Sequence, residues 1–83
     1  MKIHHYTAIF QKEPEGGYTV VIPALPGCVT YGETIEQAAD SAREAIESYL
    51  GSLAKDGEPA PTDVSFVSTI DVPGVKHSSA SYA

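Results

Sequence analysis

The strongest constraint on the fold lies in residues 18–37, which read YTVVIPALPGCVTYGETIEQ. Residues 18–22 have the period-two spacing of a strand with one buried face. Pro23 ends that strand because proline has no N–H to donate to a ladder. Pro26 and Gly27 match the central positions of a type II turn, where proline fixes φ and glycine supplies a positive φ. The sequence therefore predicts a strand followed by a tight turn.

A short strand and a helix start come next. Residues 29–31 form the predicted strand and Gly32 breaks it. Thr34 and Gln37 have the spacing of a capping box, so a helix is expected from about Ile35 to about Ala54. Its predicted core face consists of Ile35, Ala39, Ala42, Ile46, Tyr49 and Leu53, and its predicted solvent face includes Glu36, Asp40, Arg43, Glu44 and Glu47.

Two further strands complete the predicted domain. Residues 2–10 are expected to form a hairpin with residues 18–22 through the turn at 13–17, and residues 63–72 a last strand. The fold class is α+β in the order β-β-β-α-β, with one helix packed on one face of a small mixed sheet. We expect a domain over residues 1–73 and a flexible tail over 74–83. The other sheet face, with Ile3, Ile9, Val21 and Val67, is expected to be an interface of a homo-oligomer.

Composition excludes several classes of protein. Eleven acidic residues face five basic ones in 83 residues, and no basic cluster exists to neutralise phosphates. No apolar run is long enough for a signal peptide or a membrane span, so we expect a cytoplasmic protein with no membrane contact. Cys28 is the only cysteine, and we expect it to be a small buried thiol.

The sequence offers few candidates for catalytic or metal-binding residues. His4 and His5 are neighbours on a predicted strand and would point to opposite faces, and His77 lies in the tail. The sequence indicates no base that would activate Cys28 as a nucleophile. The acids of the helix have the spacing of a solvated face. We expect no catalytic residue, no metal and no cofactor.

The ordered set of turn and cap residues resembles the HicB antitoxin family over about the first seventy residues. The residues that carry the resemblance are Pro23, Pro26, Gly27, Cys28, Gly32, Glu33 and Thr34, continuing into Glu36, Ala38 and Ala39. The resemblance implies a partial RNase H-like fold and a protein that neutralises a small basic RNA-cleaving toxin of the HicA type by covering its RNA-binding surface. It implies no enzyme, because the first strand lacks the carboxylate that RNase H-like nucleases use to hold metal ions.

The chain differs from many members of that family in one respect. HicB proteins often append a DNA-binding module, and only eleven residues follow Val72, so we expect a short form that does not bind nucleic acid directly. The residues predicted to meet the toxin are Glu36, Asp40, Glu44 and Glu47; the hairpin acids Glu13 and Glu15 or the open sheet are alternatives. A solitary homo-oligomeric structural or regulatory module is the alternative function, and an RNase H-like nuclease a third.

Overall fold

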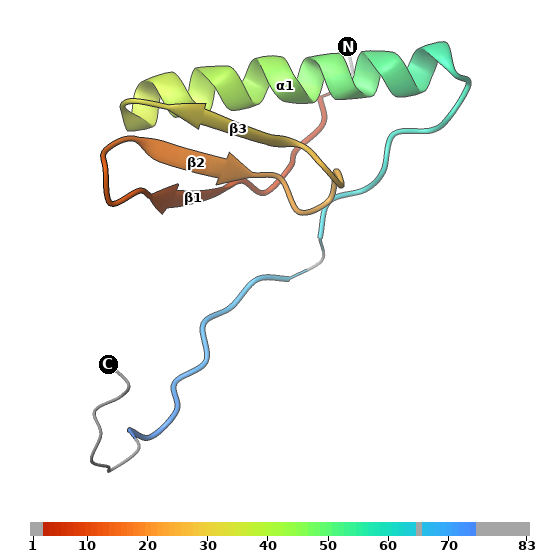
Figure 1. Cartoon of the computed structure of the whole chain (residues 1–83). Coiled ribbons are helices and arrows are strands. Elements are labelled where there is room, and N and C mark those ends of the chain that lie inside the picture. The colour runs from red at the N-terminus through yellow and green to blue at the C-terminus, as the bar shows by residue number, and fades with distance from the viewer. Residues whose placement is uncertain (1–2, 65, 75–83) are drawn as a thin grey trace.

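The computed structural model describes residues 3–64 and 66–74. Three strands, β1 (Ile9–Lys12), β2 (Tyr18–Val21) and β3 (Val29–Gly32), form an antiparallel sheet with β2 in the centre. One helix, α1 (Ile35–Lys55), lies along one face of this sheet and packs chiefly against β3 and then β2 (Figure 1). The protein is therefore an α+β domain with one helix on one face of a sheet, as predicted.

The strand register separates the two faces of the sheet. Val20 lies opposite Phe10 and Thr30, and its side chain is completely buried. The neighbouring row joins Ile9, Val21 and Val29, all of which remain exposed. Because successive side chains of a strand point to opposite faces, the Val20 row faces α1 and the Ile9 row faces away from it.

The turn between β2 and β3 has the predicted geometry. The N–H of Cys28 donates to the carbonyl of Leu25 over 2.9 Å, and Gly27 has a φ of 82°. This combination, with Pro26 before the glycine, is that of a type II turn. Beyond the turn, the Ile22 N–H donates to the Cys28 carbonyl over 3.1 Å, so the chain returns directly into β3.

The helix begins as the sequence predicts. The Thr34 side chain accepts the backbone N–H of Gln37 over 3.0 Å. The Gln37 amide oxygen reaches back to the N–H of Glu33 over 3.2 Å, one residue earlier than the usual partner. Two N–H groups at the start of the helix are thereby satisfied.

The buried core is small. It consists of Val20, Ile22, Leu25, Cys28, Ala38 and Ala42. Ala38 is fully buried, whereas Ile35, predicted to face the core, is 52% exposed. The buried stripe of α1 therefore begins at Ala38 instead of Ile35.

The bounds predicted for the first strand and the presence of a last strand are wrong. β1 begins at Ile9 instead of residue 2, because Ile9 pairs with Val21, the last residue of β2, and a residue two positions earlier would face Pro23, which cannot donate. No described residue between 63 and 72 belongs to a strand, so the sheet is antiparallel and three-stranded, not mixed and four-stranded. Most of the predicted tail, residues 75–83, lies outside the described residues.

Candidate functional site

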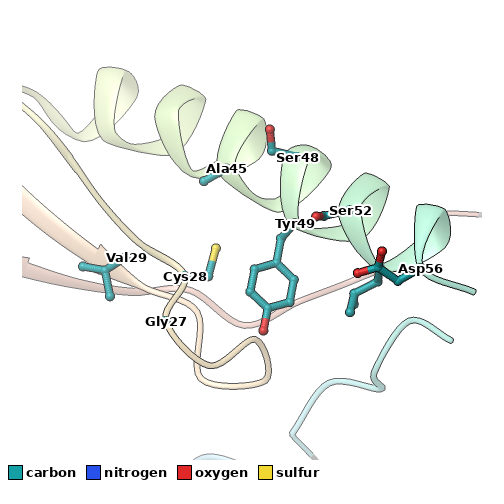
Figure 2. Close-up of a pocket in the computed structure, with 9 residues that line it drawn as sticks. Gly27, Cys28, Val29, Ala45, Ser48, Tyr49, Ser52 and Asp56 are labelled. Atoms are coloured by element: carbon teal, nitrogen blue, oxygen red, sulfur yellow. The ribbon is translucent and has the colours of Figure 1, made fainter. Parts of the chain in front are cut away.

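A shallow hollow lies between α1 and the turn that precedes β3 (Figure 2). Its wall on the helix is built by Ala45, Ser48, Tyr49, Ser52, Leu53 and Asp56, and its other wall by Gly27, Cys28 and Val29. The Tyr49 hydroxyl donates to the Pro26 carbonyl over 3.0 Å and so ties the helix to the turn. The hollow therefore lies where α1 meets the turn before β3, and one long-range hydrogen bond joins the two.

The thiol in this hollow is not activated. Cys28 is 5% exposed, and burial raises the pKa of its thiol, which favours the neutral form over the reactive thiolate. No histidine lines the hollow to act as a base. The expectation of a small buried thiol is confirmed.

The histidines near the N-terminus lie elsewhere. His4 and His5 are both exposed, and the His4 ring stacks on that of Tyr6 with 6.2 Å between centroids. Within residues 3–64 and 66–74, no three side chains of His, Cys, Asp or Glu come together in a way that could hold a metal ion. His77 lies outside the described residues.

The four acids predicted to meet a partner lie on the exposed side of α1. Glu36, Asp40, Glu44 and Glu47 are all exposed, at steps of four, four and three residues. At the rise of an α-helix they cover about 16 Å of its length. Asp40 accepts a hydrogen bond from Arg43 over 3.1 Å, and because both side chains are exposed, this ion pair is weak. We call these four residues the acidic face.

The face of the sheet opposite α1 is apolar. Ile9, Val21 and Val29 form the row across the three strands described above, and Tyr31, which is 48% exposed, stands beside it. Figure 2 shows the Val29 side chain pointing away from the helix. The Tyr31 hydroxyl donates to the Gly16 carbonyl over 3.0 Å, which holds the ring against the hairpin turn. We call these four residues the open-face patch. Ile9 and Val21 lie in it as predicted, whereas Ile3 lines a groove beside α1 and Val67 belongs to no strand, so the prediction for these two residues is wrong.

One polar contact was not predicted. The backbone N–H of Thr7 donates to Asp63 Oδ1 over 2.9 Å, and the Thr7 hydroxyl donates to Oδ2 over 2.8 Å. The Tyr6 hydroxyl donates to the Pro61 carbonyl beside them. These bonds hold the chain after α1 against the segment before β1. We call the two bonds between Thr7 and Asp63 the clasp. No local sequence pattern predicts it, because Thr7 and Asp63 are far apart in the sequence.

The acidic face and the exposed apolar sheet face are two surfaces through which a small domain can bind another protein. Comparison with known families identifies the class of protein. A family described as the HicB-like antitoxin of bacterial toxin-antitoxin systems matches residues 6–79. The chain belongs to this family.

Individual relatives support the same assignment. The chain is 47% identical over 58 residues to a UPF0150 protein of Thermoplasma acidophilum, covering 70% of this chain and 84% of the relative. It is 37% identical over 71 residues to a UPF0150 protein of Synechocystis, covering 86% and 90%. It is 32% identical over 56 residues to the antitoxin HicB of Escherichia coli, covering 68% of this chain but 41% of that protein.

In the part of the chain that the structure describes, no helix has the length and apolar character needed to cross a bilayer.

Proposed function

We propose that this protein is an antitoxin that binds and neutralises a small, basic, RNA-cleaving toxin of the HicA type. The observation that carries the proposal is the acidic face, a row of exposed carboxylates on a helix, in a chain that belongs to a family of antitoxins. A protein that grips RNA needs a basic surface for the phosphates. Carboxylates presented at regular spacing on a rigid helix are suited to cover such a surface.

The mechanism is occlusion of the toxin. The acidic face occupies the place of the RNA backbone, and charge attraction speeds the encounter. The open-face patch can add contact area that does not depend on charge, because its four residues are apolar or aromatic and already exposed. The toxin then remains folded but cannot reach RNA. No step of this mechanism requires the antitoxin to be an enzyme or to hold a cofactor.

Three finer features belong to the same proposal. The domain is assigned a partial RNase H-like fold because the family resemblance implies that architecture; the three strands and the helix are compatible with it, whereas the predicted last strand is not formed among the described residues. The target of the toxin is cytoplasmic RNA, so the antitoxin acts in the cytoplasm. The acids of α1, and not an operator-binding module, make the functional contact.

Charge reversal tests the acidic face. We expect Glu36→Lys with Glu44→Lys to lower toxin affinity about tenfold or more, since a like charge facing the basic toxin costs well over 1 kcal/mol. Both side chains are exposed, so the fold should persist. The matched control is Glu15→Lys with Glu58→Lys, which changes the net charge equally at exposed positions away from the helix face.

Growth rescue and pull-down provide the readout, with the product of any small basic reading frame found beside this gene as the toxin. The proposal requires the helix variant to lose rescue and the control to retain it. If the control loses rescue instead, the hairpin region carries the contact. If the unaltered chain neither binds nor rescues, the antitoxin assignment fails.

A solitary oligomeric module without a toxin is the second candidate. The observation that favours it is the amount of exposed apolar surface, which includes side chains after Asp63 as well as the open-face patch. Absence of a small basic reading frame beside the gene would support this candidate.

A further inference from the structure

The chain after α1 leaves the domain as an extended, unpaired segment. It is held beside the segment before β1 by the bonds from Thr7 to Asp63 and then runs away from the sheet (Figure 1). Phe66, Ile70 and Val72 are 81%, 83% and 77% exposed. Large apolar side chains that are this exposed in a single copy indicate that another surface covers them.

The segment has the pattern of a strand with one apolar face. Val64, Phe66, Ile70 and Val72 lie at even positions, interrupted only by Ser68, and residues 67, 69 and 71 at the odd positions are Val, Thr and Asp. In an extended chain, even and odd positions point in opposite directions. The segment therefore has the properties of a fourth strand that lacks a sheet.

A matching acceptor lies on the same domain. The outer edge of β1 pairs with no strand among the described residues, so its backbone N–H and C=O groups are available. Beside it, a groove runs between residues 3–10 and α1. Its apolar lining includes Ala8, Phe10, Ala39, Ala42, Ile46 and Leu50. A strand added to the edge of β1 would direct every second side chain into this groove.

We propose that residues 66–72 of one chain pair with the β1 edge of a second copy and place their even-numbered side chains in its groove, in a reciprocal dimer. The segment and the β1 edge are complementary. Among the described residues, neither the segment nor the outer edge of β1 pairs with another strand. The segment turns away from its own β1 after Asp63, which leaves the edge of another copy as its acceptor. This inference does not depend on the antitoxin function.

Charge is compatible with this pairing. The chain as a whole carries a net charge of −6, so two copies repel each other. Residues 66–74 contain a single charged side chain, Asp71, and the groove has Arg43 and Glu47 on its helix wall, which offset each other. The two surfaces can therefore meet without adding like charges.

Sedimentation of the full-length protein at micromolar concentration is the first test. We expect a dimer for the unaltered chain and a folded monomer for Phe66→Asp with Ile70→Asp, because each carboxylate would have to enter an apolar groove. The control, Val67→Asp with Thr69→Asp, adds the same charge to the opposite face of the segment and should remain dimeric. A monomeric unaltered chain, or equal disruption by the control, would overturn the proposal.

Cross-linking decides which copy accepts the segment. In a Cys28→Ala background, Gln11→Cys on β1 is made in one chain and Val67→Cys in another, and the mixture is treated with a short bis-maleimide. Exchange between copies predicts a covalent dimer containing one chain of each kind. A chain that carries both cysteines is treated in parallel. If it gives only an internal link at monomer mass, and the mixture gives no covalent dimer, the segment closes on its own domain and the proposal is wrong.

Discussion

At the scale of single residues, the clasp between Thr7 and Asp63 decides where the chain goes after the helix. The backbone N–H of Thr7 is the main cause that lowers the pKa of the Asp63 carboxyl, and the Thr7 hydroxyl contributes. Both bonds favour the ionised carboxylate. Their contribution to stability is therefore complete above the ordinary pKa of an aspartate and is lost as the pH falls through the lowered pKa of the folded state.

We expect acid to release the clasp before the domain unfolds. In a pH titration followed by NMR, the Asp63 carboxyl should titrate below the ordinary range of aspartate, and hydrogen exchange of the Thr7 amide should accelerate over the same interval. Asp63→Asn keeps an acceptor oxygen without a charge, so it should remove this pH dependence. A Thr7 amide whose exchange follows the same course in both proteins would contradict the role of the carboxylate.

Residues whose roles are local could be predicted from the sequence. Gly27 and Thr34 were assigned to a turn and a helix cap, and the structure confirms both. Asp63 could not be found in this way, because its partner Thr7 is 56 residues away and neither residue belongs to a recognisable pattern. A long-range hydrogen bond depends on the fold being assembled first.

At the scale of elements, the close approach of α1 to β3 depends on Gly32. A Cβ atom on Gly32 would overlap the backbone of Gln37 and Ala38 in the first turns of the helix. Backbone atoms cannot rotate away as a flexible side chain can, so the helix would have to move. The sequence indicated only that Gly32 ends a strand; the need for a missing side chain comes from the packing of the two elements.

We expect Gly32→Ala to destabilise the domain by about 1–3 kcal/mol, the range for an overpacked contact. Gly51→Ala is the matched control, because Gly51 lies in α1 with open space where its Cβ would be. There, alanine should stabilise the helix by up to about 1 kcal/mol. Urea unfolding measures both. Equal midpoints for Gly32→Ala and the unaltered protein would show that the helix does not depend on this contact.

The order of the elements could be predicted, but the ends of the strands could not. Turn and cap signals fix the sequence β1, β2, β3, α1, because each acts within a few residues. A strand also needs a partner along its whole length. Residues before Ile9 lack one because β2 stops at Val21, and the described residues from Phe66 onward lack one because no neighbouring strand exists in the single molecule.

At the scale of the whole molecule, the acidic face and the acceptor groove lie on one helix and share only Glu47. Glu47 lies at the wall of the groove beside β1, whereas Glu36 and Glu44 do not line it. A dimer formed through the groove would therefore leave most of the acidic face free for a toxin. The exposure of the four acids was predictable from helix periodicity; the groove was not, because it arises where α1 covers β3 and β2 more than β1.

The most direct measurement is toxin-catalysed RNA cleavage, with a purified HicA-type toxin, taken from a small basic reading frame beside this gene if one is found, and increasing amounts of the full-length protein. If the protein covers the RNA-binding surface, cleavage should stop near equimolar protein, and the Glu36→Lys and Glu44→Lys double variant should require a marked excess. The protein alone, with Mg²⁺ present, should leave the RNA intact. Cleavage that continues at full rate in an excess of folded, unaltered protein would contradict the proposed antitoxin function.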